Sequence, residues 1–205
     1  MAAKKKSANS NRRPQKKTPE PMELLHTELA EIYSAENQLM KAAPRISKAI
    51  ESEQVRELMN RRLEQGEQLI ADIENIFEDM DHSMPRKKNV AAEGLLRDMQ
   101  EHIQEIQKGP ALDAVLIGAV QKLEHYCIAA WGTTRAFGEA LGHEMTVEVM
   151  QRVLEEGKEL DEEFTRIAEE EINPAMLEAG EDGEEMEEEE APRRRGRRGG
   201  DEARA

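Results

Sequence analysis

Apolar residues recur every three or four positions along most of the chain, in stretches separated by short polar segments. This spacing places the apolar side chains on one face of an α-helix, whereas a half-buried strand would show strict alternation. The pattern predicts four long amphipathic helices and a shorter helix in the connection between the second and third of them. The long helices are expected at residues 22–50, 53–80, 111–141 and 146–176, and the short helix at residues 90–107.

Several expected helix ends carry local signals. Thr18 can cap the first helix, and Pro44 is expected to kink or end it, because proline lacks the backbone N–H that an inner helical turn needs. Gly109-Pro110 stops the short helix and starts the third long one, which Gly142 closes in the usual C-terminal manner of glycine. Asn173-Pro174 is expected to weaken the end of the last helix. Helices joined by such short connections predict an antiparallel bundle.

Three of the long helices carry a glutamate at or beside their apolar stripe. Glu36 occupies a core position between Ile32 and Leu39, Glu124 lies beside the stripe of the third long helix, and Glu156 lies among inward-facing residues of the fourth. A buried carboxylate without a partner costs several kcal/mol, so each needs a metal, a base or water. Glutamates that converge in a bundle core can bind iron or manganese; glutamates at the edge of a stripe are otherwise solvated flank residues.

Composition narrows the class of protein. Charged residues make up 36% of the chain and aromatic residues only 3%, a balance typical of solvated helices, so the fold class is predicted to be all-α. The formal charge of −15 argues against general affinity for nucleic acid. The single cysteine, Cys127, fits a reducing compartment. No run of roughly 18 apolar residues and no secretory signal is present, so we expect a cytoplasmic protein that does not cross a membrane.

The two ends differ from the helical region. Residues 1–17 are basic and residues 179–205 are first acidic and then rich in Arg and Gly, so both are predicted to be disordered tails around a domain at residues 18–178. Basic tails of this kind can contact phosphates without any folded site. Nucleic acid or another charged partner is therefore expected to bind through the tails.

Three runs of residues carry a resemblance to a known family. They are Ile32-Tyr-Ser-Ala-Glu-Asn-Gln-Leu39, Lys122-Leu-Glu-His-Tyr126 with Ile128-Ala129, and Leu154-Glu-Glu156 with Asp161. In these runs the chain resembles the YciE/YciF family of bacterial ferritin-like proteins, and the resemblance extends over roughly residues 22–170. It implies a ferritin-like antiparallel four-helix bundle, a homodimer or larger homo-oligomer, a link to bacterial stress responses, and a carboxylate-rich dimetal centre at Glu36, Glu124 and Glu156.

The chain departs from the family pattern at several expected ligand positions. Leu69 stands where members usually have a histidine, Cys127 and Gly157 stand where further acids are common, and the polar pattern near Gln65-Gly66 is thinned. A full dimetal centre in such a bundle needs four carboxylates and two histidines. His125 does not supply a ligand, because Glu124 next to it already faces inward and adjacent helical residues point about 100° apart. The metal site is therefore expected to be incomplete or altered.

Two function hypotheses follow from these residues. In the first, the three glutamates bind iron or manganese and form a vestigial ferroxidase or peroxide-consuming site. In the second, the glutamates are paired with water, Gln65 or basic residues, and the bundle is a non-catalytic assembly or binding module whose charged tails engage a partner.

Overall fold

The computed structural model describes residues 18–180, and all the regular structure in that part of the chain is helical. The all-α fold class is confirmed. The predicted tails, apart from residues 179–180, lie outside the described residues. The elements are α1 (Pro21–Ala49), α2 (Glu53–Asp79), α3 (Val90–Glu105), α4 (Pro110–Leu141), α5 (Glu144–Ile167) and the π-helical segment η1 (Ala168–Ile172).

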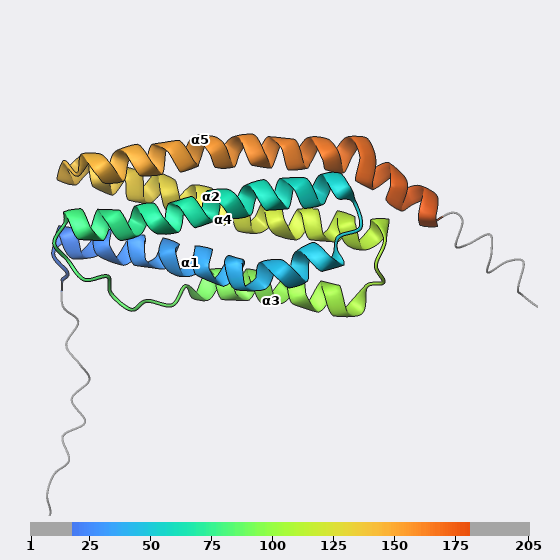
Figure 1. The fold of residues 1–205 in the computed structure, drawn as a ribbon, viewed down its shortest axis with the longest axis horizontal. Coiled ribbons are helices and arrows are strands. Elements are labelled where there is room, and N and C mark those ends of the chain that lie inside the picture. Colours follow the sequence, from blue (N-terminus) through green and yellow to red (C-terminus); the bar gives the residue numbers. More distant parts are fainter. Residues whose placement is uncertain (1–17, 181–205) are drawn as a thin grey trace, which may run out of the picture.

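Four long helices form the bundle, and each is antiparallel to the two other long helices that it packs against. In Figure 1, α1, α3 and α5 run in one direction, and α2 and α4 run in the other. The packed pairs are α1 with α2, α2 with α5, α5 with α4, and α4 with α1, so α2 and α4 lie on one diagonal. The short helix α3 covers the seam between α1 and α4. This arrangement is the predicted ferritin-like bundle with an extra helix in the crossover.

Side chains near the helix ends fix several of the connections. Ser52 caps α2 by accepting a hydrogen bond from the backbone N–H of Val55 at 3.3 Å. The buried carboxylate of Asp113 on α4 accepts hydrogen bonds from the backbone N–H groups of Glu51 and Ser52, at 2.9 and 2.7 Å. The turn between α1 and α2 is therefore attached to the start of α4. Gly142 ends α4 in the left-handed conformation, with φ 69°, as its position predicts.

One expectation about α1 is wrong. Glu20, not Thr18, precedes the first turn, and its backbone N–H donates to the Glu23 carboxylate at 3.2 Å. The helix continues through Pro44 to Ala49, within the predicted range of residues 22–50, so Pro44 does not end it. Pro44 removes one hydrogen bond on the solvent face, while Ile46 on the next turn is fully buried, so packing of the inner face outweighs that loss.

The last helix also runs past Pro174, as its predicted range of residues 146–176 allows. The backbone widens into η1 immediately before the proline, and helix then continues over residues 173–180. A proline ring clashes with the carbonyl four residues earlier in a regular α-helix, and a π-helical turn relieves that contact by changing the register. None of the helices between residues 18 and 180 is both long and apolar enough to cross a membrane.

Candidate functional site

The centre of the bundle contains an arginine that is withdrawn from solvent. Arg62 lies on α2 in the apolar stripe between Met59 and Leu69, and only 1% of its surface is exposed. The spacing of three or four residues from Met59 and from Gly66 carries its side chain to the core face of the helix. An arginine in this position must be paired, because an isolated buried charge is strongly unfavourable.

Two buried glutamates pair with Arg62, one from the neighbouring helix α1 and one from α4, which lies diagonally opposite α2. The two terminal nitrogens of Arg62 donate to the two carboxylate oxygens of Glu36 on α1, at 3.0 and 2.9 Å. The Nε of Arg62 donates to Oε2 of Glu124 on α4, at 2.5 Å. Both glutamates are 1% exposed. The bidentate contact with Glu36 uses the planar fork of the guanidinium, so Arg62 connects α1, α2 and α4 at one level.

Two glycines make room for this buried charge cluster. A Cβ atom at Gly66 would lie 2.8 Å from Oε2 of Glu36 and 3.1 Å from a terminal nitrogen of Arg62. A Cβ atom at Gly157 on α5 would lie 2.5 Å from the Trp131 ring and 2.8 Å from Oε1 of Glu124. Each distance is well below ordinary carbon contacts. The space that a side chain would need at Gly66 is therefore occupied by Glu36 and Arg62. The corresponding space at Gly157 is occupied by Trp131 and Glu124.

Apolar and soft groups surround the rest of the guanidinium. The central carbon of Arg62 lies 5.5 Å from the ring centroid of Trp131, which is fully buried. A cation over an indole ring gains further electrostatic stabilisation. The sulfur of Cys127 lies 3.8 Å from a terminal nitrogen of Arg62. Burial raises the pKa of the Cys127 thiol well above its usual value, which keeps the sulfur protonated and poorly reactive.

Burial and pairing change the pKa values of Arg62 and Glu124 to different extents. Burial alone would lower the pKa of Arg62, but Glu36 and Glu124 outweigh it and hold the pKa well above its usual value. Burial raises the pKa of the Glu124 carboxyl, and Arg62 offsets only part of that effect. One oxygen of Glu124, Oε1, has no hydrogen-bond partner among the described residues. Glu124 therefore binds a proton more readily in the folded protein than an exposed glutamate does.

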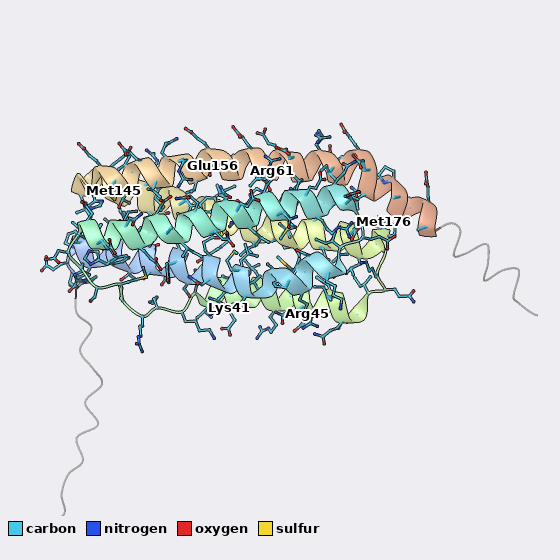
Figure 2. The ribbon with its side chains drawn as sticks, in the orientation of Figure 1. Lys41, Arg45, Arg61, Met145, Glu156 and Met176 are labelled. Carbon is cyan, nitrogen blue, oxygen red and sulfur yellow. The ribbon has the colours of Figure 1, made fainter. Side chains whose placement is uncertain are left out.

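The structure brings together two of the three predicted site residues. Glu36 and Glu124 meet through Arg62, whereas Glu156 lies at the outer seam between α5 and α2 (Figure 2). Its carboxylate faces Arg152 at 3.3 Å and the amide of Gln65 at 3.4 Å, and 41% of its side chain is exposed.

His125 is a flank residue, as its position predicts. Its side chain is 67% exposed, and its Nε2 lies 3.0 Å from a carboxylate oxygen of Asp161 on α5. It therefore points away from the cluster that contains the neighbouring Glu124.

These residues do not fit a dinuclear iron or manganese centre. Three of the four oxygens of Glu36 and Glu124 accept hydrogen bonds from a guanidinium that stays protonated at any physiological pH. The cation lies between the two carboxylates, where a metal would have to bind, and it repels other cations. Within residues 18–180, no three His, Cys, Asp or Glu side chains are grouped so that they could hold a metal ion.

The residue that sequence reasoning missed is Arg62. Pairing of the glutamates with a basic residue was one expected alternative, but no particular residue was assigned to it. A signal exists in the spacing, because Arg62 falls between Met59 and Gly66 on the apolar stripe of α2. An arginine there is normally interpreted as a side chain that extends along the surface to water, since arginine is rarely fully buried.

The fold and its core define the class of protein as a ferritin-like helical bundle. Within that class, the chain belongs to the family described as a domain of unknown function, DUF892, whose model matches residues 20–177. It is 34% identical to Protein YciF of Escherichia coli strain K12 over 146 residues, which cover 71% of this chain and 88% of YciF. The expected membership of the YciE/YciF family is therefore confirmed.

Two solved structures agree with this assignment. The crystal structure of the E. coli stress protein YciF superposes with a TM-score of 0.72 at 32% identity, covering 76% of this chain and 99% of that one. The structure of YcfI from Rhodopseudomonas palustris superposes with a TM-score of 0.68 at 28% identity, covering 72% of this chain and 94% of that one. Each superposition therefore covers nearly the whole of the solved structure and about three quarters of this chain.

Proposed function

We propose that this protein is a stress-associated ferritin-like bundle that works as a non-catalytic assembly or binding module. In this account, Arg62 takes the position that a metal would occupy between Glu36 and Glu124. The association with stress follows from the likeness to the E. coli stress protein YciF. The observation that carries the non-catalytic part is the burial of Arg62 between the two carboxylates.

The charge of Arg62 and the lack of space around it both support this proposal. A guanidinium supplies one permanent positive charge and a fixed set of donors, and it has no vacant coordination position or accessible second oxidation state. Arg62 therefore supplies positive charge to the Glu36 and Glu124 carboxylates, as a metal would, but it cannot take part in redox chemistry. The close approach of Gly66 and Gly157 to the cluster leaves no room for ligands on those turns.

Metal analysis tests the proposal. Protein purified without chelator is loaded anaerobically with Fe(II) or Mn(II), desalted and analysed for metal per chain. The expected result is less than about 0.2 metal per chain in the core, because too few ligands are free. The loaded protein should also oxidise Fe(II) no faster than buffer does.

The variant Glu124→Gln is the matched control, because it removes a core carboxylate and leaves the acidic surface unchanged. Metal that is retained equally by the wild type and the variant is bound at the surface and agrees with the proposal. About one metal or more per chain in the wild type, lost in Glu124→Gln, would instead establish an iron or manganese site in the core.

A further inference from the structure

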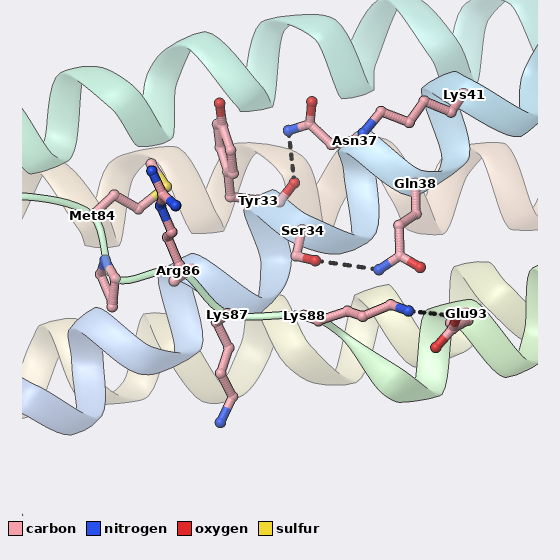
Figure 3. Close-up of a pocket in the computed structure, with 12 residues that line it drawn as sticks. Tyr33, Ser34, Asn37, Gln38, Lys41, Met84, Arg86, Lys87, Lys88 and Glu93 are labelled. Carbon is pink, nitrogen blue, oxygen red and sulfur yellow. Dashed lines mark hydrogen bonds and ion pairs between the residues drawn. The ribbon is translucent and has the colours of Figure 1, made fainter.

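A groove lies between α1 and the connection from α2 to α3 (Figure 3), and none of the three charged residues of the buried cluster lines it. Its volume is about 740 Å³, within the range of roughly 300–1,000 Å³ found for small-molecule sites. Tyr33, Asn37 and Lys41 line it from successive turns of α1, and Met84 and Arg86 line it from the connection.

The charge of the groove is opposite to that of the protein. The chain has a formal charge of −15, yet this lining contains Lys41, Arg86, Lys87 and Lys88 against one acid, Glu93. A local excess of positive charge attracts anions to a surface that elsewhere repels them.

Two of the four cations are already paired. Lys87 lies 3.2 Å from the Glu31 carboxylate, and Lys88 lies 2.6 Å from the Glu93 carboxylate. Neither Lys41 nor Arg86 has a carboxylate within 4.0 Å among residues 18–180, and both side chains are exposed. One of these two free cations comes from α1 and the other from the connection. The groove therefore has one on each of its two walls.

The remaining lining is held in place by its own contacts. The Asn37 amide donates to the Tyr33 carbonyl at 2.9 Å, and the Tyr33 hydroxyl donates to Glu74 on α2 at 2.8 Å. The Gln38 amide donates to the Asn89 carbonyl at 3.0 Å, which ties the connection to α1. A preformed site loses little conformational entropy when a ligand binds.

Apolar groups complete the lining. Ala30, Met84 and Pro85 give the groove an apolar wall beside the Tyr33 ring. Figure 3 shows the Lys41 side chain turned back toward Asn37, and Arg86 beside Met84. A ligand that fits must therefore combine a strong negative charge with an apolar or aromatic body.

We propose that this groove binds a small soluble phosphate monoester, with its negative charge attracted by the unpaired cations Lys41 and Arg86 and its body against Tyr33, Met84 and Pro85. A phosphate monoester carries about −1.5 to −2 charge at pH 7, so the excess positive charge of this lining attracts it more strongly than a carboxylate, which carries a single charge.

Calorimetric titration of the full chain with adenosine monophosphate tests the proposal. Inorganic phosphate serves as the charge without the body, and adenosine as the body without the charge. The expected result is saturable binding of adenosine monophosphate with a dissociation constant below about 1 mM, weaker binding of phosphate, and no detectable binding of adenosine. The double variant Lys41→Gln with Arg86→Gln should weaken binding about tenfold or more, because it removes both unpaired cations from the lining.

A charge-matched control is the double variant Arg45→Gln with Lys158→Gln, which removes two exposed cations outside the groove. It should keep the affinity within about twofold. Equal affinities in both double variants, or no saturable binding to the wild type, would overturn the proposal. So would binding to vesicles that contain phosphatidic acid together with no binding of adenosine monophosphate, because the site would then recognise a membrane.

Discussion

At the scale of single residues, Arg62 holds two carboxylates that would otherwise repel each other in a medium with little water. Both contact partners are as buried as the arginine itself. Buried ion pairs of this kind are weak evidence for net stability, because withdrawal of the charges from water offsets much of their attraction. Their effect becomes visible when one partner is removed and the others stay charged.

The variant Arg62→Met should therefore lose about 3–5 kcal/mol of unfolding free energy, because Glu36 and Glu124 remain buried without a counter-charge. A further change of both glutamates to leucine should restore most of that loss, since a hydrophobic core of similar volume needs no counter-charge. Urea denaturation followed by circular dichroism measures both values. A loss below about 1 kcal/mol for Arg62→Met would mean that the cluster is hydrated and not buried.

The two glutamates should respond differently to neutralisation. Because the pKa of Glu124 is raised in the folded state, its contribution is favourable at low pH and is lost as the pH rises through that value. Glu124→Gln should therefore change the unfolding free energy at pH 7 by less than about 1 kcal/mol. Glu36→Gln should lose about 2–3 kcal/mol, because the amide cannot accept both hydrogen bonds from Arg62. Equal losses at pH 7 would contradict this asymmetry.

At the scale of helices, the close approach at Gly157 sets the packing of α5 against α4. An alanine at an exposed helical glycine normally stabilises a helix by up to about 1 kcal/mol. At Gly157 the added carbon meets Trp131 and Glu124, so Gly157→Ala should instead cost about 1–3 kcal/mol. The control is Gly118→Ala on α4, where nothing lies within 4 Å of the added carbon. Thermal unfolding of the two variants should shift in opposite directions, and a shared direction would be inconsistent with the packing.

A histidine contact joins α1 to the connection after α2. The ring of His26 on α1 stacks on His82 after α2, with centroids 4.0 Å apart, and its Nε2 has no partner among the described residues. Burial lowers the pKa of His26, His82 and His143 lower it further, and Glu23 raises it. The folded state therefore favours neutral His26. Its contribution to stability is present above the usual value of 6.5 and is lost as the pH falls below it.

The melting temperature should accordingly fall between pH 7.5 and pH 5.5, and His26→Gln should reduce this fall. His102→Gln is the control, since His102 lies on α3 beside Asp98 and away from the contact. Differential scanning fluorimetry at the two pH values measures the effect. An unchanged pH dependence in His26→Gln would assign the acid sensitivity to other groups.

The sequence predicts the helices well, because their apolar stripes are long and their ends carry ordinary signals. Two local signals for a helix end, at Pro44 and at Asn173-Pro174, are overridden in the structure. At Pro44, buried residues on both sides keep the helix intact. At Pro174, the π-helical turn of η1 relieves the clash. Neither effect is visible in residue spacing, because both depend on what the helix packs against.

At the scale of the whole molecule, the candidate site could be predicted only in part. The positions of Glu36 and Glu124 follow from helical spacing, and both are buried as expected. Glu156 lies at the boundary of the apolar stripe of α5. At such a boundary, part of a turn about the helix axis separates the core face from the solvent face, and the Glu156 side chain is partly exposed. The role of Arg62 depends on which side chains three separate helices bring to one level, which a single helix pattern does not contain.

The arrangement also explains why the chain keeps the family fold while its ligand positions differ. Glu36, Arg62 and Glu124 connect α1, α2 and α4, while Gly157 lets α5 approach the same level. One charged cluster thus touches all four long helices. The Arg62 guanidinium donates to three of the four carboxylate oxygens of this polar centre.

Diffraction from crystals soaked in Mn(II), with data collected for anomalous scattering, shows whether Arg62 or a metal lies between the two carboxylates. We expect continuous density for Arg62 between Glu36 and Glu124, and no anomalous peak within about 2.5 Å of their carboxylate oxygens. An anomalous peak that bridges the two carboxylates, with Arg62 displaced from between them, would contradict this expectation.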